Sequence, residues 1–245
     1  MLDISGSFPI DSRGEERQSD IAFEMLRADI VACRLPPGLN VSEAELAARY
    51  GAGKAAIRSA LVRLSERGWV QALARRGYTV KPVTLRDIGE IFEMLRIVEP
   101  AAARRAAGRV DANRLHEIDA VCRSGYVPGD GASEATYLQA HRQFHLTVAQ
   151  AGGNPRLGDT VRHAWDETER VIYHTGLLRT RPAELRHDHA ALVSALIAGD
   201  GDAAADAAND EISALHCLVV ETALRTASQL MPAAITEERG TRPAL

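Results

Sequence analysis

Residues 42–80 read SEAELAARYGAGKAAIRSALVRLSERGWVQALARRGYTV, and this stretch decides the fold of the N-terminal part of the chain. Ser42, followed three residues later by Glu45, has the pattern of a helix N-cap with a capping box. The helix that it starts is expected to end at Tyr50-Gly51. A second helix is indicated by apolar residues spaced three and four apart, namely Ala56, Ile57, Ala60, Leu61 and Leu64.

A hairpin is expected directly after the second helix. Gly68 ends that helix, Trp69 and Val70 begin a strand, and the chain turns through residues 74–77 into a second strand at residues 78–80. Two helices joined by a tight glycine turn and followed by a hairpin predict a winged helix-turn-helix with a basic wing tip.

The charge of this segment favours DNA as its partner. Residues 49–81 hold eight basic residues and one acid, whereas the whole chain has a net charge of −4. Neutralisation of phosphates dominates DNA affinity, so the local charge matters more than the total. A basic surface that only meets solvent is the alternative, but here the charges fall on the recognition helix and the wing. The predicted DNA-binding residues are Ser42, Arg49, Lys54, Ala55, Arg58, Arg63, Arg75, Arg76 and Gly77.

The length of 245 residues predicts two domains. We expect a flexible arm at residues 1–19, the winged helix-turn-helix at 20–82, a helical domain at 83–231 and a flexible tail at 232–245. No apolar run is long enough for a transmembrane helix, and the N-terminus lacks the apolar core of a secretion signal. The three cysteines are far apart, which favours a reducing compartment over disulfides. These features predict a cytoplasmic protein.

The pattern after residue 83 is helical throughout and predicts an antiparallel bundle. The protein is therefore expected to be mainly α, with a winged helix-turn-helix followed by an all-α bundle. The expected helices are 85–108, 111–124, 133–151, one from about 155 to 173, 182–198 and 202–230.

Histidines are the informative residues in this bundle. His141 and His145 lie four apart on one expected helix, so their rings point the same way. An exposed or merely hydrogen-bonded pair remains the alternative to a metal site. His189 lies eleven residues before Asp200, the centre of the last helix turn, and Glu211 lies eleven after it. In an antiparallel hairpin, these two residues would face each other at the same height.

Three imidazoles and one carboxylate form a ligand set for a divalent metal such as Zn²⁺, Ni²⁺, Mn²⁺ or Fe²⁺. By the same helical geometry, His216 is rotated away from Glu211, and His187 points away from His189 and is expected at the surface. A metal with three histidines and a glutamate could also support hydrolysis. No nucleophile–base pair accompanies it, so the protein is not expected to be an enzyme.

Both halves together resemble the GntR family of bacterial transcription regulators, in the FadR-type branch with an all-helical FCD ligand domain. The resemblance rests on LRADIVACRLPPG, SEAELA and IRSALVRLSERGWV in the first half. In the second half it rests on Phe144-His145 through Asn154-Pro155, on the run His189 through Asp200, and on Arg96 with Glu99. It covers the chain from about residue 20 to residue 230.

The chain departs from the family pattern in its expected metal ligands. Members that bind metal commonly supply Asp, His, His and His in chain order, whereas here His141 stands in place of the aspartate and Glu211 in place of the last histidine. The two exchanges keep three histidines and one carboxylate. This pattern fits a site in which the two exchanges compensate each other and a metal is still bound. A site that no longer binds metal is the alternative.

A second departure lies in the recognition helix. The family often has G-V-S-R-T-P-V-R-E-A-L, whereas this chain has GAGKAAIRSAL at residues 51–61. Gly53 lacks the side chain of a serine cap, and Ala55 lacks a hydroxyl that could reach phosphate. Lys54 keeps a positive charge but lacks the fork of arginine that suits guanine. Arg58 is retained and is the best single candidate for a base or phosphate contact.

The resemblance implies a regulator that binds an operator as a homodimer and responds to a small metabolite. A carboxylate effector would ligate an open metal position in the bundle and pair with Arg96, and repression is the expected mode of action. Arg96 could instead form a salt bridge with Glu93 or Glu99. A DNA-binding regulator with an empty site and no effector is the alternative.

Overall fold

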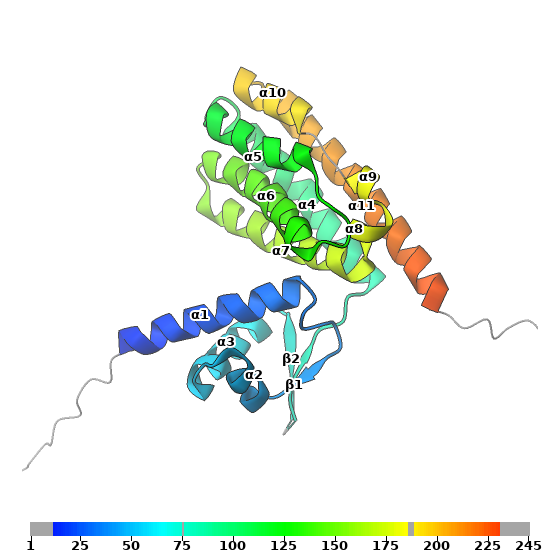
Figure 1. Cartoon of the computed structure of the whole chain (residues 1–245). Helices are drawn as coiled ribbons and strands as arrows, with labels where there is room; N and C mark the ends of the chain where they lie inside the picture. Colours follow the sequence, from blue (N-terminus) through cyan, green and yellow to red (C-terminus); the bar gives the residue numbers. More distant parts are fainter. Residues whose placement is uncertain (1–11, 75, 186–188, 231–245) are drawn as a thin grey trace, which may run out of the picture. The chain divides into compact units, whose positions relative to one another are not determined.

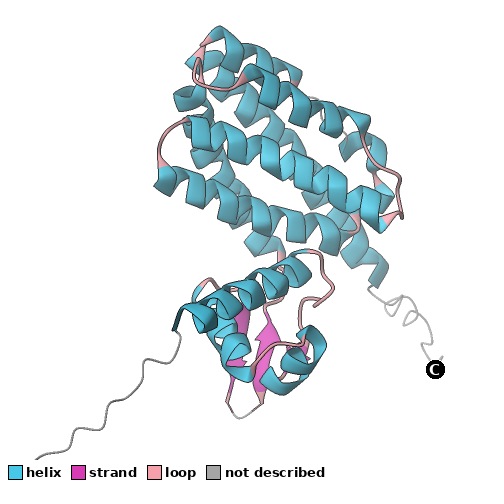
Figure 2. Cartoon of the chain, turned by 60° about the vertical axis from the view of Figure 1, so that its left-hand side comes forward, coloured by secondary structure: helices cyan, strands magenta, loops and turns pink. Residues whose placement is uncertain are grey.

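The computed structural model describes residues 12–74, 76–185 and 189–230 (Figure 1). Contacts group the chain into two units, residues 1–87 with 165–174 and residues 88–164 with 175–245. We call them the head unit and the body unit. The strands of the described chain lie in the head unit, and the body unit is helical (Figure 2).

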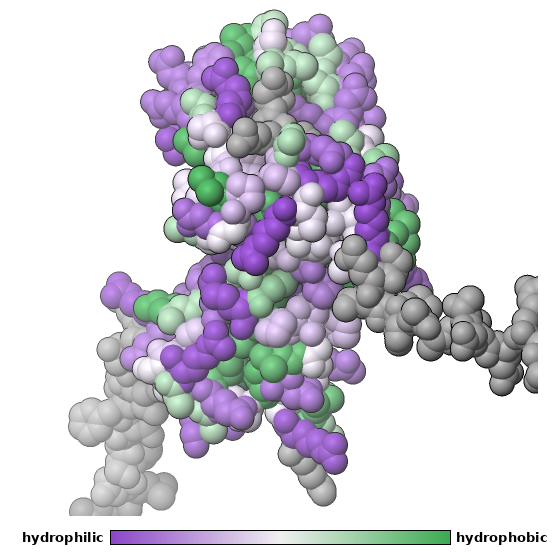
Figure 3. Space-filling view, turned by 45° about the vertical axis from the view of Figure 1, so that its right-hand side comes forward, coloured by the Kyte–Doolittle hydropathy of each residue, from purple (hydrophilic) through white to green (hydrophobic). Residues whose placement is uncertain are grey.

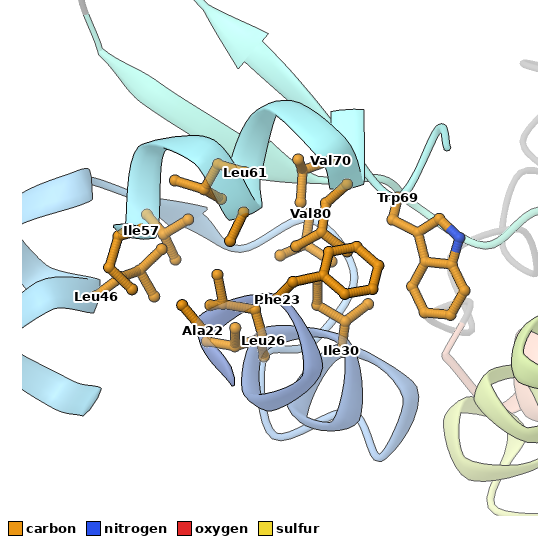
Figure 4. Close-up of a cluster of buried hydrophobic side chains, with 14 of the residues drawn as sticks. Ala22, Phe23, Leu26, Ile30, Leu46, Ile57, Leu61, Trp69, Val70 and Val80 are labelled. Carbon is orange, nitrogen blue, oxygen red and sulfur yellow. The ribbon is translucent and has the colours of Figure 1, made fainter. Parts of the chain in front are cut away.

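The head unit is the predicted winged helix-turn-helix. Helix α3 packs against both α1 and α2, and the three strands form an antiparallel sheet in the order β1–β3–β2. Its core is built from the predicted apolar faces. Ile57 and Leu61 of α3 are fully buried (Figure 4). Leu64 of the same helix is also fully buried. The elements are α1 (Ser12–Val31), β1 (Asn40–Val41), α2 (Glu43–Tyr50), α3 (Lys54–Glu66), β2 (Val70–Leu73) and β3 (Gly77–Val80).

Helix α1 corrects the expectation of a flexible arm at residues 1–19, because residues 12–19 already belong to this helix. Its buried face continues one turn back from Phe23 to Ser19, at the spacing of an amphipathic helix. The Ser19 hydroxyl lies 2.8 Å from that of Ser59 on α3 and donates a hydrogen bond to it. Residues 1–11 and the expected tail after residue 230 lie outside the described residues.

The wing requires glycine at position 77. Leu73 pairs with Gly77 and Val70 with Val80 across the β2–β3 hairpin. Gly77 has φ of 92°, a left-handed conformation, and a Cβ atom there would lie 2.3 Å from the carbonyl oxygen of Val41. The hairpin approaches β1 closely at this point. The structure therefore requires glycine at position 77, independently of any DNA contact.

The body unit holds four long helices and a C-terminal set. The prediction of one helix over residues 182–198 is wrong, because the structure has α9 and α10 there, with residues 186–188 outside the described residues. His189 takes the N-cap position of α10 and precedes its first turn. The start of α4 (residues 85–87) and the second half of α7 (residues 165–174) are grouped with the head unit. The helices are α4 (Leu85–Ala106), α5 (Ala112–Ser124), α6 (Gly131–Ala151), α7 (Pro155–Thr175), α8 (Leu177–Thr180), α9 (Pro182–Leu185), α10 (Ala190–Ala198) and α11 (Gly201–Leu230).

The core of the body unit joins five of these helices, which run side by side in Figure 1. Five of its buried members are alanines, and such small side chains allow helices to pack closely. Phe144 on α6 has the largest side chain among its buried members. The other members include Ala103 and Ala106 of α4, Leu115 of α5, Leu192 and Leu196 of α10, and Ala204 and Ala208 of α11.

The surface mixes hydrophilic side chains with smaller hydrophobic areas in the face that Figure 3 shows. Within the described residues, none of the helices is both long and apolar enough to span a membrane. The three cysteines are free thiols, with Cys122 buried, Cys33 half-buried and Cys217 exposed.

Candidate metal centre and nucleic-acid interface

Three of the four predicted metal ligands come together in the body unit. His141 and His145 lie one turn apart on α6, and the N-cap residue His189 reaches them from the start of α10. One ligand atom of each lies within 4.8 Å of the others, and all three side chains are buried. The ring centroids are 4.9 to 5.5 Å apart. The close spacing of three buried imidazoles separates this group from a chance surface pair.

Two buried carboxylates hold two of these rings. His145 Nδ1 lies 3.2 Å from Glu99 Oε2 on α4, and His189 Nδ1 lies 2.9 Å from Asp119 Oδ1 on α5. The hydrogen bond from His189 lowers the pKa of Asp119, against the opposite effect of burial. Because each carboxylate accepts the Nδ1–H proton, it fixes the tautomer that leaves Nε2 as the ligating nitrogen.

Aromatic packing completes the orientation of His189. The ring of Phe144 stacks on its imidazole, with centroids 3.8 Å apart and planes inclined by 18°. His189 is 0% exposed and its backbone N–H also points to Asp119 Oδ1, at 3.4 Å. The ring is therefore held on its face and at its Nδ1 edge before any ligand arrives.

The donor set fits a borderline divalent metal. Imidazole nitrogens suit zinc, nickel and iron, and carboxylate-backed histidines are typical of such centres. Zn–N bonds of about 2.0–2.1 Å place neighbouring ligand nitrogens about 3.3 Å apart in a tetrahedron. The separations of up to 4.8 Å would therefore close by up to roughly 1.5 Å around an ion.

The fourth predicted ligand is not part of this group. Among the described residues, the cluster within 4.8 Å comprises only the three histidines and does not include Glu211, which is half-buried on α11. The prediction paired Glu211 with His189 by equal distances along two continuous helices. His189 instead lies before α10 begins, so helical spacing does not place its side chain. His187 lies outside the described residues.

Arg96 on α4 contacts a different histidine from those of the cluster. Its Nη1 lies 3.0 Å from Nδ1 of His216, and the ring of Phe92 stacks on that histidine with centroids 4.7 Å apart. Burial and the charge of Arg96 lower the pKa of His216 below 6.5, so neutral His216 accepts this hydrogen bond. Arg96 therefore contacts His216, while Glu99 contacts His145.

The N-terminal half of α3 carries the exposed basic residues of the recognition helix. Lys54, Ala55 and Arg58 are exposed on it, and Gly53 at the N-cap provides no side-chain cap. The first-turn N–H groups are therefore free of side-chain capping at an end that favours anions. Arg58 forms an ion pair with Glu43, the first residue of α2, at 2.8 Å.

Two predicted DNA-binding arginines are engaged within the head unit. Arg49 Nη2 lies 3.1 Å from Asp29 on α1, and Arg63 Nη1 lies 2.7 Å from Asp20. The Arg63 guanidinium also covers the ring of Phe23, 4.2 Å from its centroid. Both arginines therefore connect α1 to the other helices.

Asp29 accepts more than the bond from Arg49. Tyr50 and Arg34 also donate hydrogen bonds to it. Burial by itself would raise the pKa of Asp29, but these bonds hold it below 3.8. The carboxylate therefore remains charged and joins the end of α1 to α2.

The remaining predicted residues lie at the start of α2 and in the wing. Ser42 caps α2 in the predicted capping box, with the Glu45 N–H donating to its hydroxyl at 3.2 Å and its own N–H donating to Glu45 at 2.8 Å. Arg76 is exposed beside Gly77 in the hairpin turn. Arg75 lies outside the described residues.

Sequence reasoning did not identify Glu99 and Asp119 as the carboxylates that hold His145 and His189. Glu99 falls in line with the buried Leu95 and Ala102 of α4, and Asp119 lies next to the buried Ile118 of α5. An acid on the apolar stripe of a helix must have a partner, because burial of an unpaired charge is costly. That position in the pattern is the feature that could have revealed both.

A winged helix-turn-helix with a basic recognition helix, joined to a helical unit that gathers buried histidines, defines a DNA-binding transcription regulator. The sequence matches the bacterial regulatory proteins of the gntR family over residues 18–80 and the FCD domain over residues 90–214. The chain therefore belongs to the gntR family and carries an FCD domain. This family and its relatives are transcription regulators rather than enzymes.

Relatives agree with this assignment. The chain is 25% identical over 181 residues to the HTH-type transcriptional repressor RspR of Escherichia coli K12. The alignment covers 74% of this chain and 79% of that protein. It is 23% identical over 210 residues to the Nta operon transcriptional regulator of Aminobacter aminovorans, covering 84% and 93%. The solved structure of E. coli McbR/YncC has the same fold, with a TM-score of 0.67 at 20% identity, covering 86% and 98% of the two chains.

Proposed function

We propose that this regulator is a repressor whose operator affinity is controlled by a small carboxylate, bound at a divalent metal in the body unit. The metal ligands in this proposal are His141, His145 and His189. The main support for this proposal is the set of three buried imidazoles, two of which are held through Nδ1 by Glu99 and Asp119.

A metal on three histidines would supply a Lewis-acidic position that an anionic oxygen of the effector can occupy. Glu211 would then serve as a fourth ligand only if α11 brings it closer, and otherwise the fourth position belongs to the effector. Arg96 lies three residues before Glu99 on the same helix, and such residues are neighbours on a helix surface. Its guanidinium is suited to the second end of a carboxylate ligand.

Operator reading requires two head units in this proposal. Two chains pair through their body units and place two recognition helices on a roughly palindromic operator. Arg58 reads a base edge, and Lys54 and Arg76 contact phosphates. Effector binding changes the relative placement of the two head units, so effector and operator affinities are coupled.

The metal is tested first, on full-length protein purified without chelator or histidine tag. Elemental analysis should find about one divalent metal per chain, and His145→Ala should lose it. His116→Ala is the matched control, because His116 is exposed on α5 and outside the cluster. Loss of metal in Glu211→Ala as well would make Glu211 a ligand. Retention of full metal content by His145→Ala would refute the site.

The effector is tested with duplex fragments from the promoter regions beside the protein's own gene. Metal-loaded protein should retard one of them, and a panel of small hydroxy- and dicarboxylates should contain one that releases it. The second candidate function is a regulator without metal. It is favoured if wild-type protein binds such a fragment, contains no metal and binds none when Zn²⁺ is added.

A further inference from the structure

Arg58 and Glu43 form a two-point contact on the surface that the recognition helix presents. Arg58 Nε lies 3.0 and 3.1 Å from the two carboxylate oxygens of Glu43, and its Nη2 lies 2.8 Å from Oε2. Glu43 belongs to α2 and Arg58 to the second turn of α3, two helices that pack together in the head unit (Figure 1). The contact therefore ties the best candidate base-reading side chain to a neighbouring helix.

The pair remains at the surface and remains charged. The Arg58 side chain is 68% exposed and that of Glu43 24% exposed. The hydrogen bonds from Arg58 lower the pKa of Glu43, and the charge of Lys54 acts in the same direction. Glu43 thus remains ionised at neutral pH, hydrogen-bonded to Arg58 and close enough to Lys54 to be affected by its charge.

The contact uses one particular edge of the guanidinium group. Arginine has five N–H donors in a planar fork. Glu43 takes the edge formed by Nε and one N–H of Nη2. The end-on edge, formed by Nη1 and the other N–H of Nη2, remains available. Two parallel N–H groups of this kind match O6 and N7 of guanine in the major groove.

The carboxylate also disfavours the other common partner of arginine. A DNA phosphate approaching Arg58 would meet the negative charge of Glu43 at short range, whereas guanine offers neutral acceptors. Pairing also reduces the rotamer freedom that an exposed arginine would lose on binding.

We propose that Glu43 is a positioning residue for sequence recognition, which holds the fork of Arg58 so that it reads a guanine rather than a phosphate. This inference rests on the proposed role of Arg58 as a base contact. The charge of Glu43 opposes binding to DNA in general. Its effect is to increase the difference in affinity between sites with the correct and with an incorrect base pair.

The experiment is in vitro selection from a randomised duplex DNA library with full-length protein, followed by anisotropy titration of the selected site and its single-base variants. The proteins are wild type, Glu43→Gln, Arg58→Lys and the control Glu66→Gln. Glu66 is exposed at the last position of α3, so its exchange makes the same charge change away from Arg58. Thermal melting of each variant checks the fold.

Wild type should prefer one guanine per half-site by roughly 10- to 100-fold, the discrimination of a good bidentate contact. Glu43→Gln should reduce this preference to about threefold or less at the same position that Arg58→Lys affects, while binding to unrelated DNA stays equal or becomes tighter. Glu66→Gln should keep the wild-type profile.

Three results would overturn the inference. A Glu43→Gln profile equal to that of wild type would remove Glu43 from recognition, even if Arg58→Lys changes the profile. Equal weakening of all sequences by Glu43→Gln would make its role structural only. If Arg58→Lys leaves every position unchanged, the proposed role of Arg58 itself fails, and with it the basis for positioning by Glu43.

Discussion

Replacement of Asp119 by asparagine should weaken metal binding without removing a ligand. Asp119 Oδ1 accepts the Nδ1–H of His189 at 2.9 Å, and the side chain of Asp119 is 5% exposed. Asparagine keeps the shape but not the charge, so the imidazole becomes less basic and its tautomer is no longer enforced. Loss of such a partner typically costs 10- to 100-fold in metal affinity, which is about 1.4–2.7 kcal/mol.

That loss is measurable in two ways. Competition with a chromophoric chelator gives the dissociation constant for Zn²⁺ directly. With metal in excess, the same free energy appears as a smaller metal-induced stabilisation. For a chain of this size, 1 kcal/mol corresponds to about 2–4 °C, so the rise in Tm on adding Zn²⁺ should shrink by roughly 3–10 °C. Comparison of each variant with and without metal cancels any general loss of stability.

Arg123→Gln is the matched control. Arg123 Nε pairs with the other oxygen of Asp119 at 3.1 Å, and its side chain is 55% exposed. Its exchange leaves the contact with His189 intact and should change the affinity by about twofold at most, as expected for an exposed pair. If Asp119→Asn binds Zn²⁺ as tightly as wild type, then His189 is not a ligand that Asp119 orients, and the reasoning fails.

Three further predictions concern the head unit. Gly77→Ala should lower the free energy of unfolding of the head unit by about 1–3 kcal/mol or more in urea denaturation, because φ is 92° and the added Cβ would meet Val41. An unchanged midpoint of unfolding would contradict this. Ser42→Ala should cost about 0.5–2 kcal/mol through loss of the capping box with Glu45, whereas Ser42→Thr should restore most of it. The pKa of Asp29 lies below 3.8 in the fold, so its stabilising contribution is complete above pH 3.8 and disappears as the pH falls through the folded value. Asp29→Asn should therefore be less stable than wild type at pH 6, and this deficit should shrink in acid unfolding titrations.

The fold of the head unit could be predicted well from local sequence. The capping box at Ser42, the apolar spacing of α3 and the turn at Gly77 each depend on residues close together in the chain. The start of α1 could not be predicted in the same way. Residues 12–19 are polar, and only burial of Ser19 against α3 shows that the helix begins before the expected domain boundary.

The candidate site was predictable only in part. The spacing of His141 and His145 on one helix places both rings correctly, because helical geometry fixes that relation. The position of Glu211 relative to His189 depends on how α10 begins, which spacing does not reveal. The partners of Arg49 and Arg63 depend on the placement of α1, so the sequence did not reveal that both pair with acids within the head unit. Their contact with DNA stays a prediction.

The histidine cluster links more of the body unit than its three members indicate. His145 and His189 come from α6 and α10, while Glu99 and Asp119 extend the contacts to α4 and α5. An ion held there would cross-link four helices through side chains that already touch. Amide hydrogen exchange should therefore slow in all four together when Zn²⁺ is added, since opening any one of them would expose a charged centre to water.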